Sequence, residues 1–449
     1  MSRAPSMRIE REPSCRASKN SGATARFRAI HDGAELQAHG KIGHIGTCVP
    51  IDDPDRMNAL LRAATALAAT ALSLGAVAAD APAPDAAASA PVAPAPCSAP
   101  GADRAVDDAC AMTLARHAES QSKAGHNDAA LAAFARADQF FPEDLRFAIA
   151  HAGLSLKLAN QLSPAGIEAA AKASPEDIGL LMLHAELAAG KKDYVAALAD
   201  VDQVIARRPT STMAWETRAS INAARPDFAA ARGDVDKAMS LDPKSPPALR
   251  LRGVLRSNDG DYAGALADFE AAHALAPRPD DPFVIGSTQF LMRQFGDAAD
   301  TLARAAPPAP SGTYWLLWRY MALARLTGVE RASGSLGPGA APGASVPWPV
   351  PVIDFFHGNI DAATMLAFAA KSQAAKDLSQ VCEAHFYMAE DALLRRRGDA
   401  IALFRQAARE CPANFHEYEG AVAELKAAGV PLTAPGPTLA AASAASAAN

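Results

Sequence analysis

Two cysteines and two histidines near the C-terminus are the residues best suited to do chemistry. Two residues separate Cys382 from His385, and four separate Cys411 from His416. On a helix, residues three apart lie on one face, so Cys382 and His385 would present a sulfur and an imidazole together. Two thiolates and two imidazoles form a tetrahedral zinc set. One hypothesis is therefore a metal-binding subunit of an envelope enzyme complex.

The same cysteines also fit a disulfide bond. Expected helices over 378–395 and 399–410 form an antiparallel hairpin, in which Cys382 near the start of one helix faces Cys411 at the end of the other. That bond would close a loop of about 30 residues, worth about 3–4 kcal/mol. Cys97 and Cys110 would pair likewise and tie the preceding linker to the first repeat. We predict two disulfides; unpaired thiols and zinc remain the alternatives.

The chain carries no motif of a known catalytic or cofactor site. G-x-S-x-G, H-E-x-x-H, the P-loop and the Rossmann fingerprint are all missing from the sequence. Glu390 and Asp391 are neighbours on an expected helix, so they point apart, and we expect both to face solvent. The run 395–397 is three arginines at a turn, which we expect to be solvated. The sequence thus predicts a protein that is not an enzyme and holds no cofactor.

The middle of the chain repeats a unit of 33 or 34 residues. The unit 246–279 has an apolar first segment, a Gly260-Asp261-Tyr262 turn, and a second segment that a proline ends. Alanines seven apart, on one helix face, recur in the second segments, as at Ala265 and Ala272. A fixed period of this length predicts stacked helix hairpins. The closing proline recurs at Pro142, Pro175, Pro209, Pro243, Pro277 and Pro310.

This pattern resembles the tetratricopeptide repeat (TPR), with its small residue in the first helix and A-x3-F…P in the second. The resemblance implies an all-α fold: a right-handed superhelical solenoid of TPR hairpins over 107–327, followed by a C-terminal helical module over 348–428. In TPR proteins, the second, fifth, ninth and twelfth positions of the first helix line a concave groove that binds a protein or peptide. Those positions, with the adjacent Asn258, imply a groove of Met182, Glu186, Met213, Glu216, Ser220, Arg250, Val254, Ser257, Asn258, Phe283, Ser287 and Phe290.

Within this groove, Arg250 and Asn258 would hold a peptide backbone or carboxylate. Methionine and phenylalanine would supply adaptable apolar contact area. The alternative is that several of the twelve residues only cover neighbouring helices.

Residues 57–78 have the form of a secretory signal peptide. A short basic start at Met57 precedes the apolar run 63–74, and Gly75-Ala-Val-Ala78 offers a cleavage site. We therefore expect translation to begin at Met57, with 1–56 a misassigned, disordered extension. The alternative is an internal core helix after a disordered arm. The mature protein would then be periplasmic or secreted, without a membrane span.

Three further segments have the composition of irregular chain. We expect a disordered Ala/Pro-rich linker over 79–106, a flexible Gly/Pro-rich loop over 328–347, and a disordered tail over 429–449. Between these segments, Trp315, Trp318 and Met321 form a stripe on an expected helix, which we interpret as core packing.

The C-terminal module carries a second resemblance. The run WPVPVIDFFHGNI, then CEAHFYMAED, then Cys411-Pro412 and Glu417-Tyr418, is similar to the C-terminal module of proteobacterial TPR proteins. These resemble the periplasmic lipoprotein adaptor that presents substrates to a carboxyl-terminal processing protease. Members of that family bind proteins and are not enzymes. In this sequence no cysteine directly follows the predicted cleavage site, so the chain lacks the lipidated cysteine of the lipoprotein members.

Composition narrows the class of partner. The chain has 449 residues, half of them hydrophobic, only 6% aromatic, and a formal charge of −6. It is too acidic for a nucleic-acid binder, and its abundant alanine favours helix. The sequence therefore predicts a non-catalytic periplasmic scaffold or adaptor with a protein or peptide partner, acting in envelope assembly or protease-substrate presentation. It leaves the oligomeric state open.

Overall fold

The computed structural model describes most of the chain beyond residue 103. The predictions for the signal peptide (57–78) and for 432–449 lie outside the described residues, as do most of 1–56 and of the linker 79–106. The described residues are 30–31, 34–35, 97, 100–101, 103–304, 311–340, 346–371, 379–413 and 415–431.

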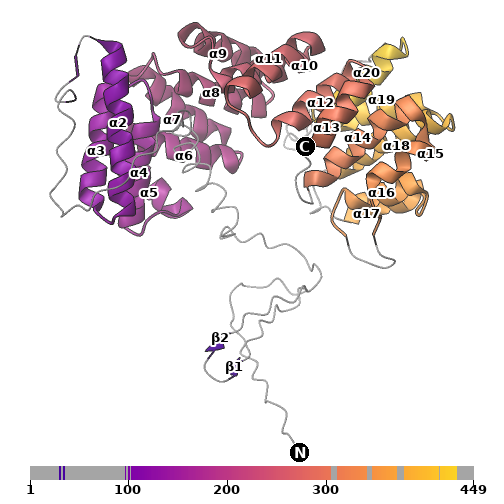
Figure 1. The fold of residues 1–449 in the computed structure, drawn as a ribbon, viewed down its shortest axis with the longest axis horizontal. Coiled ribbons are helices and arrows are strands. Elements are labelled where there is room, and N and C mark those ends of the chain that lie inside the picture. Colours follow the sequence, from indigo (N-terminus) through magenta and orange to yellow (C-terminus); the bar gives the residue numbers. More distant parts are fainter. Residues whose placement is uncertain are drawn as a thin grey trace, which may run out of the picture.

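Helices make up nearly all the regular structure of the described residues (Figure 1). The exceptions are strands β1 (Ile30–His31) and β2 (Ala34–Glu35), which pair antiparallel. The helices are α2 (Arg104–Lys123), α3 (Asn127–Phe140), α4 (Arg146–Leu158), α5 (Pro164–Ala173), α6 (Ile178–Gly190), α7 (Tyr194–Arg207), α8 (Thr212–Ala224), α9 (Phe228–Leu241), α10 (Pro246–Asn258), α11 (Tyr262–Leu275), α12 (Asp281–Leu291), α13 (Phe295–Arg304), α14 (Ser311–Thr327), α15 (Val329–Ala332), the 3₁₀ helix η1 (Ser333–Leu336), α16 (Val350–His357), α17 (Ala362–Lys371), α18 (Ser379–Arg395), α19 (Ala400–Glu410) and α20 (His416–Ala427).

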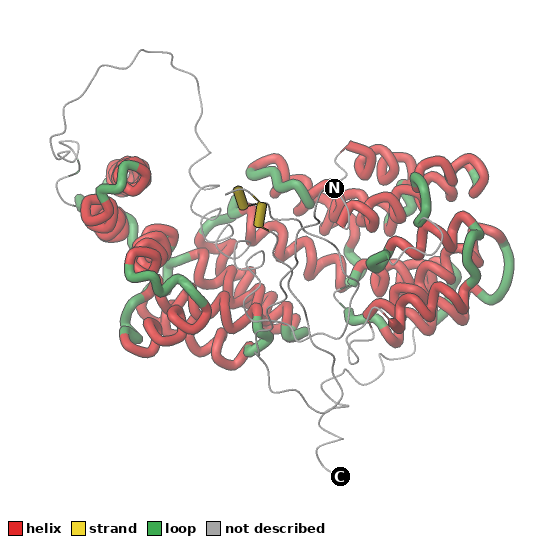
Figure 2. The backbone as a smooth tube through the Cα atoms, turned by 90° about the horizontal axis from the view of Figure 1, so that it is seen from below, coloured by secondary structure: helices red, strands yellow, loops and turns green. Residues whose placement is uncertain are grey.

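The predicted hairpins are present and stack into a curved solenoid. The pairs α2/α3, α6/α7, α8/α9, α10/α11, α12/α13 and α18/α19 each pack closely. Figure 1 shows them following one another along an arch, with α2–α7 at one end and α12–α20 at the other, and Figure 2 shows the same stack of helices from below. The fold is the all-α, TPR-type solenoid that the 34-residue period predicts.

The second repeat departs from this regularity. Helix α4 packs chiefly on α3 and α6, while α5 packs on α6. Gly179 in α6 permits the close approach, since a Cβ there would collide with the backbone of Ala148. Helix α5 buries only Ala171. Its Ile167 and Ala170 pack against the core but are only partly buried, so α5 buries less apolar surface than the second helix of a regular unit.

Aspartates cap the second helices of the central repeats. The side chains of Asp193, Asp227 and Asp261 accept hydrogen bonds from the backbone N–H three residues on. Asp399 does the same at the start of α19. Such caps satisfy an N–H that would otherwise lack a partner. They fix where each second helix begins, and so set the turn length of the hairpin.

Glycines let the two helices of a hairpin approach closely. A Cβ at Gly253 would lie 2.6 Å from the ring of Phe269, and one at Gly286 would lie 2.6 Å from Leu302. Phe269 and Leu302 are the bulky residues that the sequence places between the paired alanines. Each therefore packs over a glycine, as a large residue opposite a small one.

Replacing Gly253 by alanine is expected to destabilise the fold by about 1–3 kcal/mol, because the added methyl overpacks the contact with Phe269. Gly233 in α9 is the matched control, since a Cβ there meets nothing within 4 Å. Gly233→Ala should instead stabilise by about 0.5–1 kcal/mol, through helix propensity. Urea unfolding of both variants checks the pair, and equal shifts would contradict the packing argument.

The C-terminal module shares one large core with the last repeat, since Phe290 of α12 and Leu302 of α13 belong to it. Trp315, Trp318 and Met321 are all buried, as the stripe predicts, the last two within this core. The segment expected as a loop over 328–347 begins instead with α15 and η1, whose Ala332 and Leu336 are buried in the same core. Helix α20 ends at the left-handed Gly429. Among the described helices, none has both the length and the apolar character that a membrane span requires.

Candidate interaction surface

The first helices of the repeats lie on the inner side of the curve. They touch one another at α4/α6, α8/α10 and α12/α14, whereas the second helices α7, α9 and α11 make at most marginal contact with each other. A solenoid bends toward the side on which its helices are closer. The term inner face is used below for the sides of α6, α8, α10 and α12 that carry Glu186, Ser220, Val254 and Ser287.

The predicted groove residues differ widely in exposure. Ser220 is exposed. Seven of them are half-buried: Glu186, Met213, Glu216, Arg250, Val254, Asn258 and Phe283. The other four are buried: Met182, Ser257, Ser287 and Phe290. Both amide atoms of Asn258 are buried without a hydrogen-bond partner among the described residues.

Two of these residues join one first helix to the start of the next. Glu216 in α8 accepts a hydrogen bond from Ser245, the N-cap of α10. Arg250 in α10 donates to both carboxylate oxygens of Asp281 at the start of α12, at 2.8 and 2.9 Å, and also to the carbonyl of Ala276. Burial would raise the pKa of Asp281, but the hydrogen bonds from Arg250 and its neighbours outweigh it and lower that pKa. Most donors of the Arg250 guanidinium are already engaged by its hydrogen bonds to Asp281 and Ala276.

Two carboxylates on this face stand in poorly solvated surroundings. Burial raises the pKa of Glu186, for which no other cause is seen. Burial likewise raises the pKa of Glu216, and the hydrogen bond from Ser245 only partly offsets it. A cationic or hydrogen-bond-donating group from a partner would meet Glu186 where water competes weakly.

A set of ion pairs locks the central hairpins and was missed in the sequence. His184 pairs with Asp200 at 2.6 Å, Arg218 with Asp234 at 2.6 Å, and Arg252 with Asp268 at 2.6 Å. Each pair spans 16 residues, from a first helix to its second helix. The aspartates are largely buried. The signal was present in the sequence as His or Arg followed 16 residues later by Asp, at a 34-residue period.

The C-terminal helix α20 lies over the inner side of α12 and α14. The His416 ring sits against Phe283, with centroids 5.0 Å apart, and near Trp318 at 6.2 Å. Gly420 lies against Phe386 of α18 and against Trp318. The predicted groove residue Phe283 is thus covered by the chain's own C-terminus.

A buried charge cluster fastens α20 to the solenoid. Arg325 of α14 donates from Nη2 to Glu390 of α18 at 2.8 Å and to Glu424 of α20 at 3.0 Å. Arg293, after α12, approaches Glu424 at 3.4 Å. Glu390 is completely buried, which corrects the expectation that it faces solvent.

The neighbouring Asp391 is also buried, against expectation. It pairs with Arg395 and Arg397 at 2.6 Å each. Two arginines of the run 395–397 therefore neutralise a buried carboxylate, although they were expected to be solvated. Helix α18 carries the two carboxylates to different partners on different sides.

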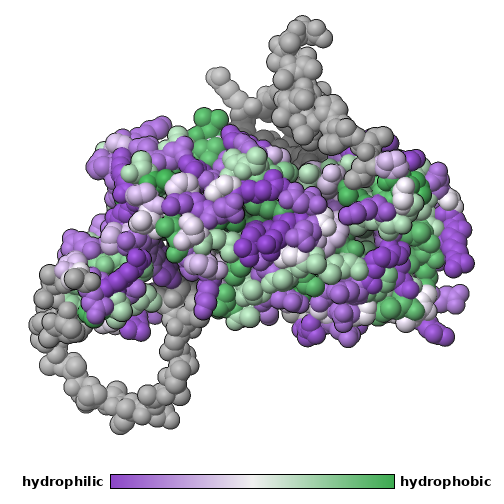
Figure 3. Space-filling model, turned by 90° about the horizontal axis from the view of Figure 1, so that it is seen from above, coloured by the Kyte–Doolittle hydropathy of each residue, from purple (hydrophilic) through white to green (hydrophobic). Residues whose placement is uncertain are grey.

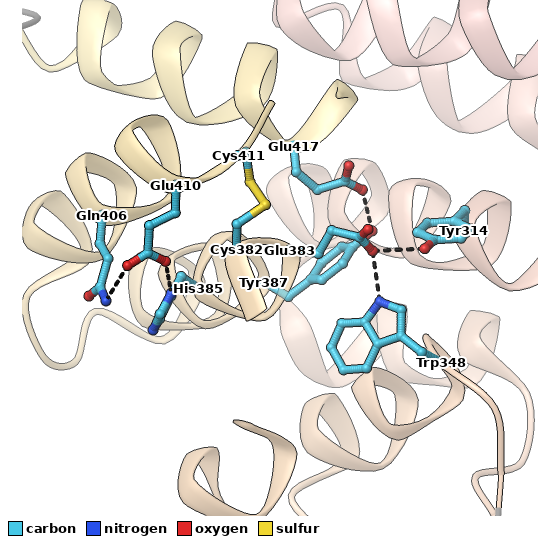
Figure 4. The surroundings of a disulfide bond; sticks show 10 residues. All are labelled: Tyr314, Trp348, Cys382, Glu383, His385, Tyr387, Gln406, Glu410, Cys411 and Glu417. Carbon is cyan, nitrogen blue, oxygen red and sulfur yellow. Dashed lines mark hydrogen bonds and ion pairs between the residues drawn. A yellow bond between two sulfur atoms is a disulfide. The ribbon is translucent and has the colours of Figure 1, made fainter. Parts of the chain in front are cut away.

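Both predicted cysteine pairs lie at bonding distance as disulfides. Cys97 joins Cys110 with Cα atoms 5.4 Å apart, and Cys382 joins Cys411 at 5.1 Å. The second bond ties the first turn of α18 to the end of α19 (Figure 4). Because Cys382 and Cys411 bond each other, their sulfurs are occupied.

The two histidines of the zinc hypothesis point to other partners. His385 is hydrogen-bonded through Nδ1 to Glu410 at 2.6 Å (Figure 4). His416 lies 3.4 Å from Glu419. Over the described residues, no group of three or more His, Cys, Asp or Glu side chains is placed to hold a metal ion.

A polar network fills the core beside this disulfide. Glu383 accepts hydrogen bonds from Tyr314 and from the Trp348 indole, each at 2.7 Å, while Tyr387 donates to Glu417 at 2.8 Å. Figure 4 shows these side chains converging between α14, α18 and the start of α20. Because the carboxylates have hydroxyl and indole donors, the network ties Trp348 and α20 to the body of the module.

The described features define an α-helical repeat protein with TPR-type hairpins and a helical module folded back on its last repeats. The chain is similar to a tetratricopeptide repeat protein from Parabacteroides merdae (17% identity, TM-score 0.34, 50% of this chain and 90% of that one). It is also similar to a thermophilic TPR protein of Thermus thermophilus (18%, 0.31, 47% and 98%). A third similar structure is yeast Tom70 (14%, 0.24, 73% and 55%). No family model and no curated protein matches the chain.

Proposed function

We propose that the protein is a non-catalytic scaffold that binds a protein or peptide on the inner face of α6, α8 and α10. The observation that carries this proposal is the repetition of the same helix positions along one curved face. Consecutive first helices present Glu186, Ser220 and Val254 there at 34-residue intervals. A regular array of this kind fits an extended polypeptide, whose backbone also repeats.

Packing supports the assignment to these three helices. Among the described residues, α6, α8 and α10 pack chiefly on helices of their own or adjacent repeats. Helix α12, in contrast, is covered by α20. Figure 3 shows hydrophilic and hydrophobic residues interspersed over the face of the molecule that is seen from above.

The compartment is part of the proposal. Two disulfides in one chain are typical of oxidising compartments, and residues 57–78 have the form of a secretory signal. We place the scaffold in the periplasm or outside the cell. An adaptor role, in envelope assembly or in presenting substrates to a processing protease, follows from the resemblance of 348–428 and from the location.

Site-specific photo-crosslinking tests the binding face. A benzophenone amino acid at Ser220, exposed on α8, is expected to yield a discrete protein adduct in cells. The matched control is Ser240, also exposed but on α9, the second helix of the same repeat. In a separate pulldown without the crosslinker, Ser220→Arg should abolish recovery of the partner, while Ser240→Arg should not. Equal adducts from both positions would exclude the inner face as the site.

A further inference from the structure

Helix α20 occupies a place that a partner would otherwise reach. It is the last described helix, and it packs chiefly on α19 and also on α18 and α12. It reaches α14 through Trp318 and Arg325, and its His416 covers Phe283. Its end also approaches the turn between α10 and α11, where Lys426 Nζ would lie 3.8 Å from a Cβ at Gly260. A change in how firmly α20 docks would therefore change how much of the inner face is open.

The buried carboxylates beneath α20 outnumber the buried cations. Glu390 from α18 and Glu424 from α20 share one buried guanidinium, that of Arg325 from α14. The second cation, Arg293 from the turn after α12, is half exposed and 3.4 Å from Glu424. Two buried carboxylates beside one buried cation favour the uptake of one proton.

Glu390 is the group that takes this proton. Its carboxyl is completely buried, whereas Glu424 is 10% exposed on its side chain and lies nearer Arg293. Burial raises the pKa of Glu390 to about 7, against the opposing effect of Arg325. The ordinary value is 4.5, and the carboxylate of Glu424 on α20 is one of the causes that raise the pKa of Glu390. Release of α20 takes that carboxylate away and lowers the pKa of Glu390, so protonation of Glu390 favours the docked helix.

A second titratable group under α20 acts in the opposite direction. Burial would lower the pKa of His416, but the carboxylate of Glu419 outweighs it and raises that pKa. Glu419 lies on α20 itself, three residues further on, so it stays beside His416 when α20 is released, and burial is what docking adds. Other charged groups at this interface are Glu417, bonded to Tyr387, and Lys426, near Gly260. Because burial disfavours the charged imidazole, protonation of His416 opposes docking and partly offsets the effect of Glu390.

We propose that α20 is a proton-controlled cover over the inner side of α12 and α14, held down in acid and loosened toward neutral pH. Loosening uncovers Phe283 and extends the inner face by one first helix. The effect of this extension on a partner rests on the proposed function; the movement of α20 does not.

Hydrogen exchange measured at several pH values tests the cover. After normalisation to intrinsic exchange rates, the protection of 416–427 is expected to fall at least about tenfold between pH 5 and pH 7.5 and then to level off, while that of α6 stays constant. Glu390→Gln replaces the carboxyl by a neutral amide, so it should retain much of its pH 5 protection at pH 7.5. His416→Gln removes the opposing group, so the fall in protection should be at least as large as in the wild type, and the double variant should be flat.

Unchanged pH dependence in the double variant would overturn the proposal, as would equal pH dependence in α6 and α20. A crosslinker at Phe283, with adducts that increase from pH 5 to pH 7.5, would extend the result to the partner. Loss of adducts at Ser220 with a normal exchange profile would count against the scaffold function alone. A pH-independent exchange profile with normal adducts would count against the cover alone.

Discussion

Arg325→Met is expected to lower the free energy of unfolding by about 3–5 kcal/mol at neutral pH. The substitution leaves Glu390 and Glu424 buried without their shared cation, and breaking one partner of a buried ion pair costs about that much. It also removes the cation that lies over the rings of Phe290 and Phe295, 5.9 and 5.7 Å from their centroids. The loss should be smaller at pH 5, where Glu390 is protonated and needs no cation. Urea unfolding at pH 5 and pH 7.5 measures both values.

An exposed arginine serves as a control that separates the loss of buried charge compensation from the general effect of replacing an arginine by methionine. Arg331 in α15 is exposed, so Arg331→Met should change stability by less than about 0.5 kcal/mol. Adding Glu390→Leu to Arg325→Met should recover at least half of the lost stability, because uncharged side chains replace part of the ion cluster. If Arg325→Met were no more harmful than Arg331→Met, Arg325 would not be compensating buried charge.

The repeat architecture could be predicted because its causes are local. Each unit needs a small residue such as Gly253, a bulky one such as Phe269, a capping aspartate and a closing proline. All of these fall within 34 residues, so the period appears directly in the sequence. The disulfides were predictable for the same reason, since Cys382 and Cys411 belong to one expected hairpin.

The docking of α20 had no such local cause. Glu424 and Arg293 are 131 residues apart in sequence, and no periodicity joins them. Glu390 and Asp391 are adjacent charges that a helix would ordinarily turn to solvent. The full fold is needed to bring Arg325 to Glu390, whereas Arg395 reaches Asp391 as an i,i+4 neighbour on the same helix. The groove residues inferred by position include Phe283, whose covering by α20 depends on these long-range contacts.

Removing the disulfide between α18 and α19, with Cys382→Ala and Cys411→Ala, is expected to cost about 3–4 kcal/mol. The bond spans 29 residues, and the cost is mainly the chain entropy that the unfolded state regains. Alanine avoids placing a hydroxyl in the apolar site of the fully buried Cys382. Cys97→Ala with Cys110→Ala opens a shorter span of 13 residues and should cost about 3 kcal/mol, slightly less.

Reductant is the internal control for this prediction. Wild-type protein unfolded in urea with dithiothreitol should lose both contributions, whereas the variant that lacks all four of these cysteines should be indifferent to it. Because α20 follows Cys411 directly, opening this bond should also raise hydrogen exchange in 416–427 more than in α6. A reduced wild type as stable as the oxidised one would mean that the cysteines do not form disulfides in the folded protein, and the oxidising compartment would lose its structural support.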